Sequence, residues 1–204
     1  MKCFRRFVMS LAVLAAIAAT SATGDAQAVV IESIDPTAAV SGTSTTAFQA
    51  PGGVQLRCRH DVTIPPAAFT GTASVTITAA NSVYSSCRDP LLSRCDQRVS
   101  GQWTIRASTT SSATMRLDSP LILQCTSRLL VPFTCVFFIR DLQTLPATFT
   151  NPVAPATTGM LSIRMPNQLH YMIDAGSNCP AGSPGTSGYF SITENLATTN
   201  LRFR

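Results

Sequence analysis

Cysteine is the residue type whose number and spacing point most directly to chemistry in this chain of 204 residues. The six cysteines beyond the first 28 residues are Cys58, Cys87, Cys95, Cys125, Cys135 and Cys179. An even number in an exported chain predicts three disulfides, because exported thiols meet an oxidising compartment. A structural zinc site typically contains a close Cys-x-x-Cys pair, which is absent, and Cys58-Arg59-His60 has only distant partners. We therefore expect disulfides and no metal site.

Loop length predicts how these cysteines pair. Cys125 and Cys135 flank residues 126–134, so a hairpin over residues 121–139 would bring them opposite each other. Cys87 and Cys95 enclose a polar loop that a bridge would close at its base, which leaves Cys58 for Cys179. Other pairings stay open, since spacing alone does not fix connectivity.

Only two histidines, His60 and His170, are available for a catalytic triad. The nucleophile motifs G-x-S-x-G and S-x-x-K are absent. His60 precedes Asp61, but neighbours on a strand point to opposite faces, so adjacency does not make a dyad. We expect a structural or surface role for both histidines, with His170 in solvent.

The acidic residues do not single out a catalytic pair. A glycosidase holds two carboxylates about 5–10 Å apart, whereas several acids here adjoin predicted turns, where Asp commonly bonds its own backbone. Phosphate-binding glycine loops and dinucleotide fingerprints are also absent. We therefore predict no catalytic residue and no cofactor. The acids beyond residue 28 are Glu32, Asp35, Asp61, Asp89, Asp96, Asp118, Asp141, Asp174 and Glu194.

The first 28 residues are expected to be a secretory signal. A cationic start with Lys2, Arg5 and Arg6 precedes a nearly continuous apolar stretch over residues 7–19. Ala26-Gln27-Ala28 then has the small-x-small form that signal peptidase cleaves. We expect cleavage after Ala28, with Ala22 as the alternative, a secreted or extracytoplasmic protein, and no membrane-spanning segment thereafter.

The net charge of the chain is +5, and removing the signal lowers it to about +3 because Lys2, Arg5, Arg6 and Asp25 leave. All remaining cations are arginines, spread singly along the sequence. Proteins that bind nucleic acid usually cluster their cations. Coding bias is therefore the preferred interpretation, and no nucleic-acid partner is expected.

Period-two alternation of apolar and polar residues predicts short strands. Residues 121–123 and 136–139 are apolar on both faces, which is typical of central strands. We predict an all-β fold, an antiparallel β-sandwich of short strands stabilised by disulfides, with the single tryptophan, Trp103, packed in its core against a disulfide. The alternating segments are residues 54–59, 74–79, 103–107, 161–165, 169–173 and 201–204.

Residues 29–204 are expected to form one domain. Residues 29–50, with a polar run over residues 41–46, are expected to be a partly mobile lead-in. Residues 145–158 contain three prolines and are expected to be a long surface connection.

The order of these features resembles exported, disulfide-containing β-sandwich proteins of high-GC bacteria that have no assigned activity. The features are a cysteine-containing strand, residues 71–77, Ser86-Cys87, a short loop to Cys95, then Trp103 and a later cysteine pair, within residues 54–190. The resemblance implies a disulfide-clipped sandwich without a known activity.

Two classes of function follow. The first is an exported, non-catalytic protein that binds or assembles at the cell surface, using Ser/Thr strand faces and the loops 87–95 and 176–188 to contact a surface protein or glycan. The second is a secreted hydrolase, which requires His60 or His170 within hydrogen-bonding reach of a serine or aspartate. An eight-strand outer-membrane barrel fits less well, because one Trp and three Tyr cannot form aromatic girdles.

Overall fold

The computed structural model describes residues 28–51, 54–89, 94–127, 133–164, 167–179 and 182–204. The expected signal therefore lies outside the described residues, apart from Ala28, and its cleavage stays a prediction. No helix in these ranges is long and apolar enough to cross a membrane.

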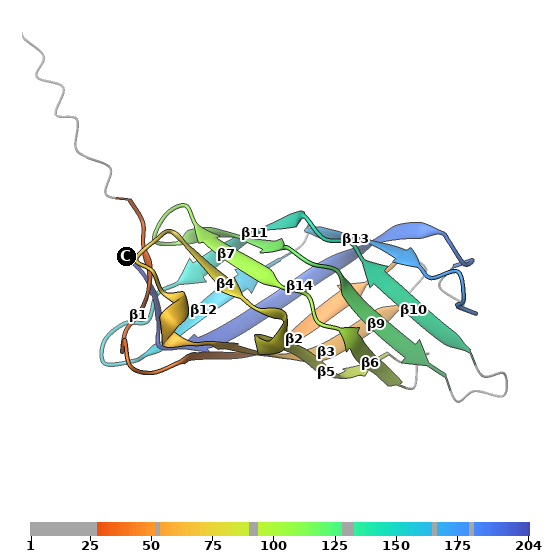
Figure 1. Cartoon of the computed structure of the whole chain (residues 1–204), viewed down its shortest axis with the longest axis horizontal. Helices are drawn as coiled ribbons and strands as arrows, with labels where there is room; N and C mark the ends of the chain where they lie inside the picture. The colour runs from red at the N-terminus through yellow and green to blue at the C-terminus, as the bar shows by residue number, and fades with distance from the viewer. Residues whose placement is uncertain (1–27, 52–53, 90–93, 128–132, 165–166, 180–181) are drawn as a thin grey trace, which may run out of the picture.

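Strands make up nearly all of the regular structure (Figure 1). Two short 3-10 helices, η1 (Pro66–Ala68) and η2 (Ala79–Asn81), lie on either side of β4. The strands are β1 (Ile31–Ser33), β2 (Val40–Gln49), β3 (Gln55–Ile64), β4 (Ser74–Ile77), β5 (Ser82–Arg88), β6 (Arg94–Val99), β7 (Trp103–Ala107), β8 (Ser112–Leu117), β9 (Leu121–Thr126), β10 (Thr134–Ile139), β11 (Gln143–Thr150), β12 (Thr158–Ile163), β13 (Gln168–Ile173), β14 (Ser187–Thr199) and β15 (Leu201–Phe203).

The main sheet is antiparallel and closes on itself. Its order is β13-β10-β9-β6-β5-β3-β2-β14-β12-β11-β8-β7-β4, and a further pairing of β13 with β14 completes a ring of eight strands. The long strand β14 makes this possible, because residues 187–191 pair with β13 and residues 194–199 pair with β12. The all-β prediction is confirmed. The prediction of a sandwich is corrected: the sheet closes into an eight-strand barrel, and strands β12, β11, β8, β7 and β4 continue from the other half of β14.

The ring of Tyr171 lies close to the backbone of Gly188 where β13 pairs with β14. A Cβ atom at Gly188 would lie 2.7 Å from the Tyr171 hydroxyl oxygen, so only glycine leaves room for this ring. Gly188 pairs directly with Tyr171, whose ring in turn packs against Phe190 at 4.3 Å between centroids.

Most inward side chains of the ring are apolar, apart from a buried polar group around His60. Inward positions recur at every second residue, for example Leu56, Cys58, Val62 and Ile64 of β3, all of which are buried. Outward positions of the same strand are mostly exposed. Burial of the inward side chains provides the main driving force for folding.

The six cysteines form a row around the ring. The bonds are Cys58–Cys87, Cys95–Cys125 and Cys135–Cys179. The prediction that all six pair is confirmed, but the predicted pairs Cys125–Cys135, Cys87–Cys95 and Cys58–Cys179 are wrong. Strand register explains the error: Cys87 faces Cys95 and Cys125 faces Cys135 across neighbouring strands, so two predicted partners are neighbours that do not bond. A cysteine inside this row has a neighbour on each side, and loop length cannot choose between them.

Residues 29–50 are more structured than the lead-in that the sequence analysis expects. Residues 40–49 form the ring strand β2, which pairs with β3 on one side and β14 on the other. Its polar residues Ser44 and Thr46 take inward positions, where they contact other polar groups. The polar run therefore reflects a polar site inside the core rather than a loop.

The expected surface connection over residues 145–158 also contains a strand. Leu145, Ala147 and Phe149 alternate inward on β11. The side-chain amide of Asn167 donates a hydrogen bond to Pro146 O at 2.9 Å. The carbonyl of Pro146 therefore points away from its paired strand β8, and its nitrogen points the same way because both groups of a strand residue lie on one side. A proline at such an open edge removes no ladder hydrogen bond.

Trp103 is fully buried in β7, which confirms its predicted place in the core. It pairs with Leu117 of β8 and Ile77 of β4, in the part of the sheet that lies outside the ring of eight strands. The cysteines lie on ring strands or beside them. The predicted packing of Trp103 against a disulfide stays a prediction.

The disulfide connectivity is directly testable. Trypsin cleaves after arginine, and the arginines place each of the six cysteines in a peptide of its own. Non-reducing digestion should give linked peptides that join Cys58 to Cys87, Cys95 to Cys125, and Cys135 to Cys179. Mass spectrometry measures these masses, and a dominant Cys87–Cys95 or Cys125–Cys135 link would contradict the row described above.

Candidate functional site

A chain of hydrogen-bonded polar side chains lies inside the ring, centred on His60. The Nδ1 atom of His60 lies 2.6 Å from Oε1 of Glu194, and Nε2 lies 3.0 Å from the Ser82 hydroxyl. Ser44 donates a further hydrogen bond to Glu194 Oε1 at 2.6 Å. The order serine, histidine, carboxylate is the order of a catalytic triad.

Four adjacent strands supply this polar chain: Ser44 lies on β2, His60 on β3, Ser82 on β5 and Glu194 on β14. β14 pairs with β2 over residues 191–193 and again over residues 197–199, and Glu194 lies between these stretches. Its side chain therefore reaches across β2 to His60. The Tyr84 ring stacks on His60 at 4.0 Å between centroids and an interplanar angle of 10°.

Burial and hydrogen bonding act on Glu194 in opposite directions. Removal from water disfavours its charged form, but attraction to His60 and hydrogen bonds from His60 and Ser44 outweigh this and hold the pKa of Glu194 below its ordinary value of 4.5. Burial, with a contribution from the Glu194 charge, raises the pKa of Tyr84 well above its ordinary value. The hydrogen bonds around Glu194 therefore favour its carboxylate form.

The polar chain is sealed from solvent. The relative exposure of His60 and of Ser82 is 0%, and that of Glu194 is 1%. Five surface hollows of the described residues are lined by other side chains. Since a nucleophilic serine must reach the substrate carbonyl, this geometry holds strands together and does not present a reactive hydroxyl.

Sequence reasoning left His60 a structural or surface role and missed its partners. The signal was present in the alternation: Leu56 and Cys58 point inward, so His60 does as well, and Phe190 and Ile192 likewise place Glu194 inward. A histidine and an acid at inward positions of two strands are expected to pair, because a buried polar group is costly unless it is hydrogen-bonded. As predicted, Asp61 points away from His60 and pairs instead with Arg59 at 2.8 Å.

His170 does not join a catalytic group. It lies on β13, on the face opposite Leu169 and Tyr171 as predicted, but it is half-buried rather than fully solvated. Its ring meets Tyr189 edge-on at 5.1 Å between centroids. Within the described ranges, no hydrogen bond joins its side chain to a serine or an aspartate, and its Nδ1 atom has no partner.

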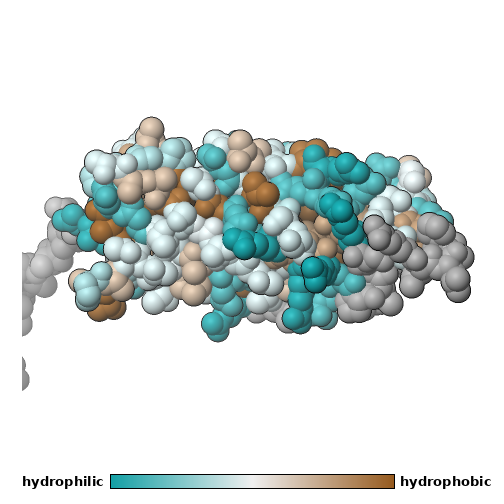
Figure 2. All heavy atoms as spheres, turned by 90° about the horizontal axis from the view of Figure 1, so that it is seen from below, coloured by the Kyte–Doolittle hydropathy of each residue, from teal (hydrophilic) through white to brown (hydrophobic). Residues whose placement is uncertain are grey.

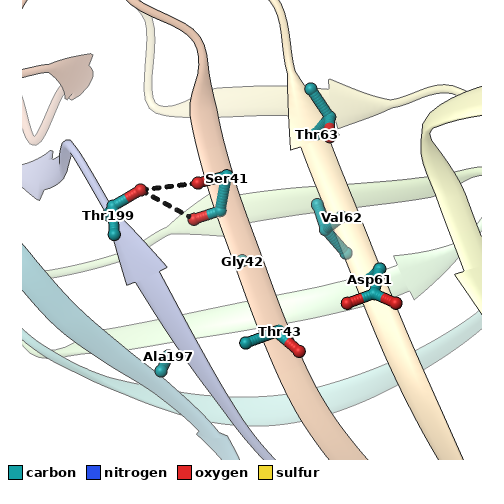
Figure 3. Close-up of a pocket in the computed structure, with 8 residues that line it drawn as sticks. All are labelled: Ser41, Gly42, Thr43, Asp61, Val62, Thr63, Ala197 and Thr199. Atoms are coloured by element: carbon teal, nitrogen blue, oxygen red, sulfur yellow. Dashed lines mark hydrogen bonds between the residues drawn. The ribbon is translucent and has the colours of Figure 1, made fainter.

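The outer face of β14, β2 and β3 contains a hydroxyl-rich hollow (Figure 3). The hollow has a volume of about 240 Å³ and is lined by Ser41, Gly42, Thr43, Asp61, Val62, Thr63, Ala197 and Thr199. Ser41 and Thr199 hold each other through hydroxyl groups 2.7 Å apart. The role of Ser/Thr strand faces in contacting a partner stays a prediction, and this hollow is a surface to which it applies.

Five arginines lie on the outer face of the next strands, β3, β5 and β6. We call this set the arginine face, and it comprises Arg57, Arg59, Arg88, Arg94 and Arg98, all of which are exposed. Hydrophilic side chains gather over this part of the molecule in Figure 2. The arginines are spread singly along the sequence, but strand pairing brings distant ones together, such as Arg57 and Arg88.

A second hollow lies within the arginine face. It has a volume of about 440 Å³ and is lined by Ser86, Cys87, Arg88, Arg94, Cys95 and Asp96. Cys87 and Cys95 form the one paired position in the ladder between β5 and β6 among the described residues, and the Gln97 side chain bridges these strands further along. The hollow borders the predicted contact loop 87–95, of which residues 90–93 lie outside the described residues; of the other predicted contact loop, residues 176–188, the structure describes residues 176–179 and 182–188.

The remaining acids do not form a metal or glycosidase site that the structure can show. Among the described residues, His, Cys, Asp and Glu side chains do not gather in groups of three or more that could hold a metal ion. Two of these acids form ion pairs with an arginine two residues away, Asp96 with Arg94 and Asp118 with Arg116.

Comparison with known proteins identifies no relative: no family model, curated protein or solved structure matches this chain. The resemblance to exported proteins of high-GC bacteria therefore stays a prediction, and the argument for function rests on the geometry of the two faces and the buried chain.

The buried pair should show strong coupling in stability. Replacing one partner, in Glu194→Met or His60→Leu, should lower the free energy of unfolding by about 3–5 kcal/mol, because the other partner stays buried without its counterpart. The double variant removes both groups and should lose less than the sum. Urea denaturation measures all four proteins, and additivity within about 0.5 kcal/mol would contradict direct coupling.

Stability should also fall in acid. The pKa of Glu194 is lower in the folded state than its ordinary value of 4.5, so its stabilising contribution is present above that value. It is lost as the pH falls through the folded-state pKa. The urea concentration at the unfolding midpoint of the native chain should therefore decrease as the pH is lowered below about 4.5. Glu194→Gln should flatten this dependence on pH. Asp61→Asn is the matched control, since Asp61 also has a lowered pKa but lies at the surface, and it should change the profile less.

Proposed function

We propose that this chain is an exported, non-catalytic binding protein that acts at or outside the cell surface. The observation that carries the proposal is the contrast between its two polar regions. The chemically suggestive groups, Ser82, His60 and Glu194, are sealed inside the ring, whereas the outer face of β14, β2, β3, β5 and β6 has hollows lined by hydroxyl and guanidinium groups.

The disulfides support the export part of the proposal. Three bonds use all six cysteines beyond the expected signal, and such frameworks persist in oxidising compartments. The covalent row crosses β3, β5, β6, β9 and β10, so it braces the strands that carry the arginine face. A rigid scaffold of this kind suits a surface that binds without changing shape.

A secreted hydrolase is the second candidate, and one specific observation favours it: His60 lies within hydrogen-bonding reach of Ser82. For this function the ring would have to open along β5 to expose the serine. The Tyr84 ring, which stacks on His60 and contacts Phe48 at 5.7 Å, packs over the same site and opposes such opening.

Labelling with a fluorophosphonate probe separates the two candidates. The native, disulfide-bonded chain should remain unlabelled, because Ser82 is inaccessible, while an active serine esterase in the same reaction labels fully. Labelling that is lost in Ser82→Ala would establish a reactive serine and overturn the non-catalytic proposal. Fractionation of cells that express the full chain tests export, which predicts recovery outside the cytoplasm.

A further inference from the structure

We infer that the arginine face binds an anionic polysaccharide whose acidic groups are carboxylates. This inference deepens the proposed function, on which it rests, by naming the chemistry of the partner. It begins with the register of β3 and β5, which sets Arg57 directly opposite Arg88. Like charges at opposed positions of neighbouring strands destabilise a sheet.

The described acids do not form ion pairs with these two arginines. In the part of the chain that the structure describes, no ion pair joins Arg57, Arg88 or Arg98 to a carboxylate. Arg57 donates a hydrogen bond to the neutral side chain of Gln55, and Arg98 donates one to that of Gln124. Their guanidinium groups are therefore available to an external anion.

The other charged groups on this surface leave an excess of positive charge. Arg59 pairs with Asp61 and Arg94 with Asp96, and both arginines stay open to solvent, with side-chain exposures of 62% and 71%. Asp89 is buried and accepts a short hydrogen bond from the Gln55 backbone. Guanidinium groups bind carboxylates through paired, charge-assisted hydrogen bonds, which is the chemistry that this arrangement offers.

The lining of the two hollows favours a sugar polymer over other polyanions. The outward positions of β3 carry Arg57, Arg59, Asp61 and Thr63 in sequence, so the arginine face runs into the Ser/Thr hollow of Figure 3. Hydroxyl and carboxylate groups there can exchange hydrogen bonds with sugar hydroxyls. An anionic polysaccharide presents both acidic groups and hydroxyls along one chain.

Nucleic acid and acidic protein fit this surface less well. Binding of single strands uses aromatic platforms on which bases stack, and the exposed residues of β3, β5 and β6 include no aromatic side chain. Protein interfaces have an apolar centre, and the exposed large apolar residues of these three strands are only Val83 and Val99.

The test measures binding of the disulfide-bonded chain to immobilised polygalacturonate, with uncharged dextran as the blank. The triple variant Arg57→Gln, Arg88→Gln, Arg98→Gln removes the unpaired charges of the arginine face. The matched control Arg106→Gln, Arg140→Gln, Arg164→Gln removes the same charge from exposed residues elsewhere that also have no ion pair with a carboxylate in the described ranges.

We expect the native chain to bind polygalacturonate and not dextran. The site variant should weaken binding by about tenfold or more and reduce its dependence on salt, because fewer counterions are released, whereas the control should change affinity by less than about twofold. Equal losses in the two variants, or no binding by the native chain, would overturn the inference. Tighter binding to single-stranded DNA or to polyglutamate would overturn it as well.

Failure of this inference can be distinguished from failure of the proposed function. A chain that resists the fluorophosphonate probe and is exported, yet ignores polygalacturonate, refutes the carboxylated polysaccharide alone. A chain with a reactive Ser82 refutes the proposed function whatever its affinity for the polymer.

Discussion

The buried hydrogen bond between His60 and Glu194 is the interaction on which the architecture depends most. Strand β14 serves two neighbours, pairing with β13 at its start and β12 at its end, and Glu194 lies where the partner changes. Its carboxylate reaches across β2 to His60 of β3 and also accepts a hydrogen bond from Ser44 of β2. It therefore links β14, the strand that closes the ring, to β2 and β3. A register slip of one residue would point this charge into solvent and the outward residues into the core.

This polar chain is costly, and its value lies in specifying one arrangement. Removing a carboxylate and an imidazole from water carries a penalty that hydrogen bonds only partly return. Tyr84 Oη and Glu194 Oε2 have no hydrogen-bond partner within the described ranges, which adds to that penalty. The packing of Phe48, Phe137, Phe190 and their neighbours supplies the stability, while the buried pair selects the register.

Sequence reasoning recovered what depends on local pattern and lost what depends on which strands meet. Period-two alternation correctly predicted the strands around Leu56, Trp103 and Leu169, and the hairpin that sets Cys125 opposite Cys135. It could not show that Cys125 bonds to Cys95 on its other side, nor that the ring would close through β14. The arginine face was invisible for the same reason, since Arg57 and Arg88 become neighbours only through the pairing of β3 with β5.

The most direct test of a sealed histidine compares the only two histidines of the chain. Diethylpyrocarbonate modifies accessible imidazoles, and tryptic peptides separate His60 from His170. The account predicts that half-buried His170 reacts in the native chain while His60 reacts only after unfolding and reduction. Modification of His60 at a rate equal to that of His170 in the native chain would contradict it.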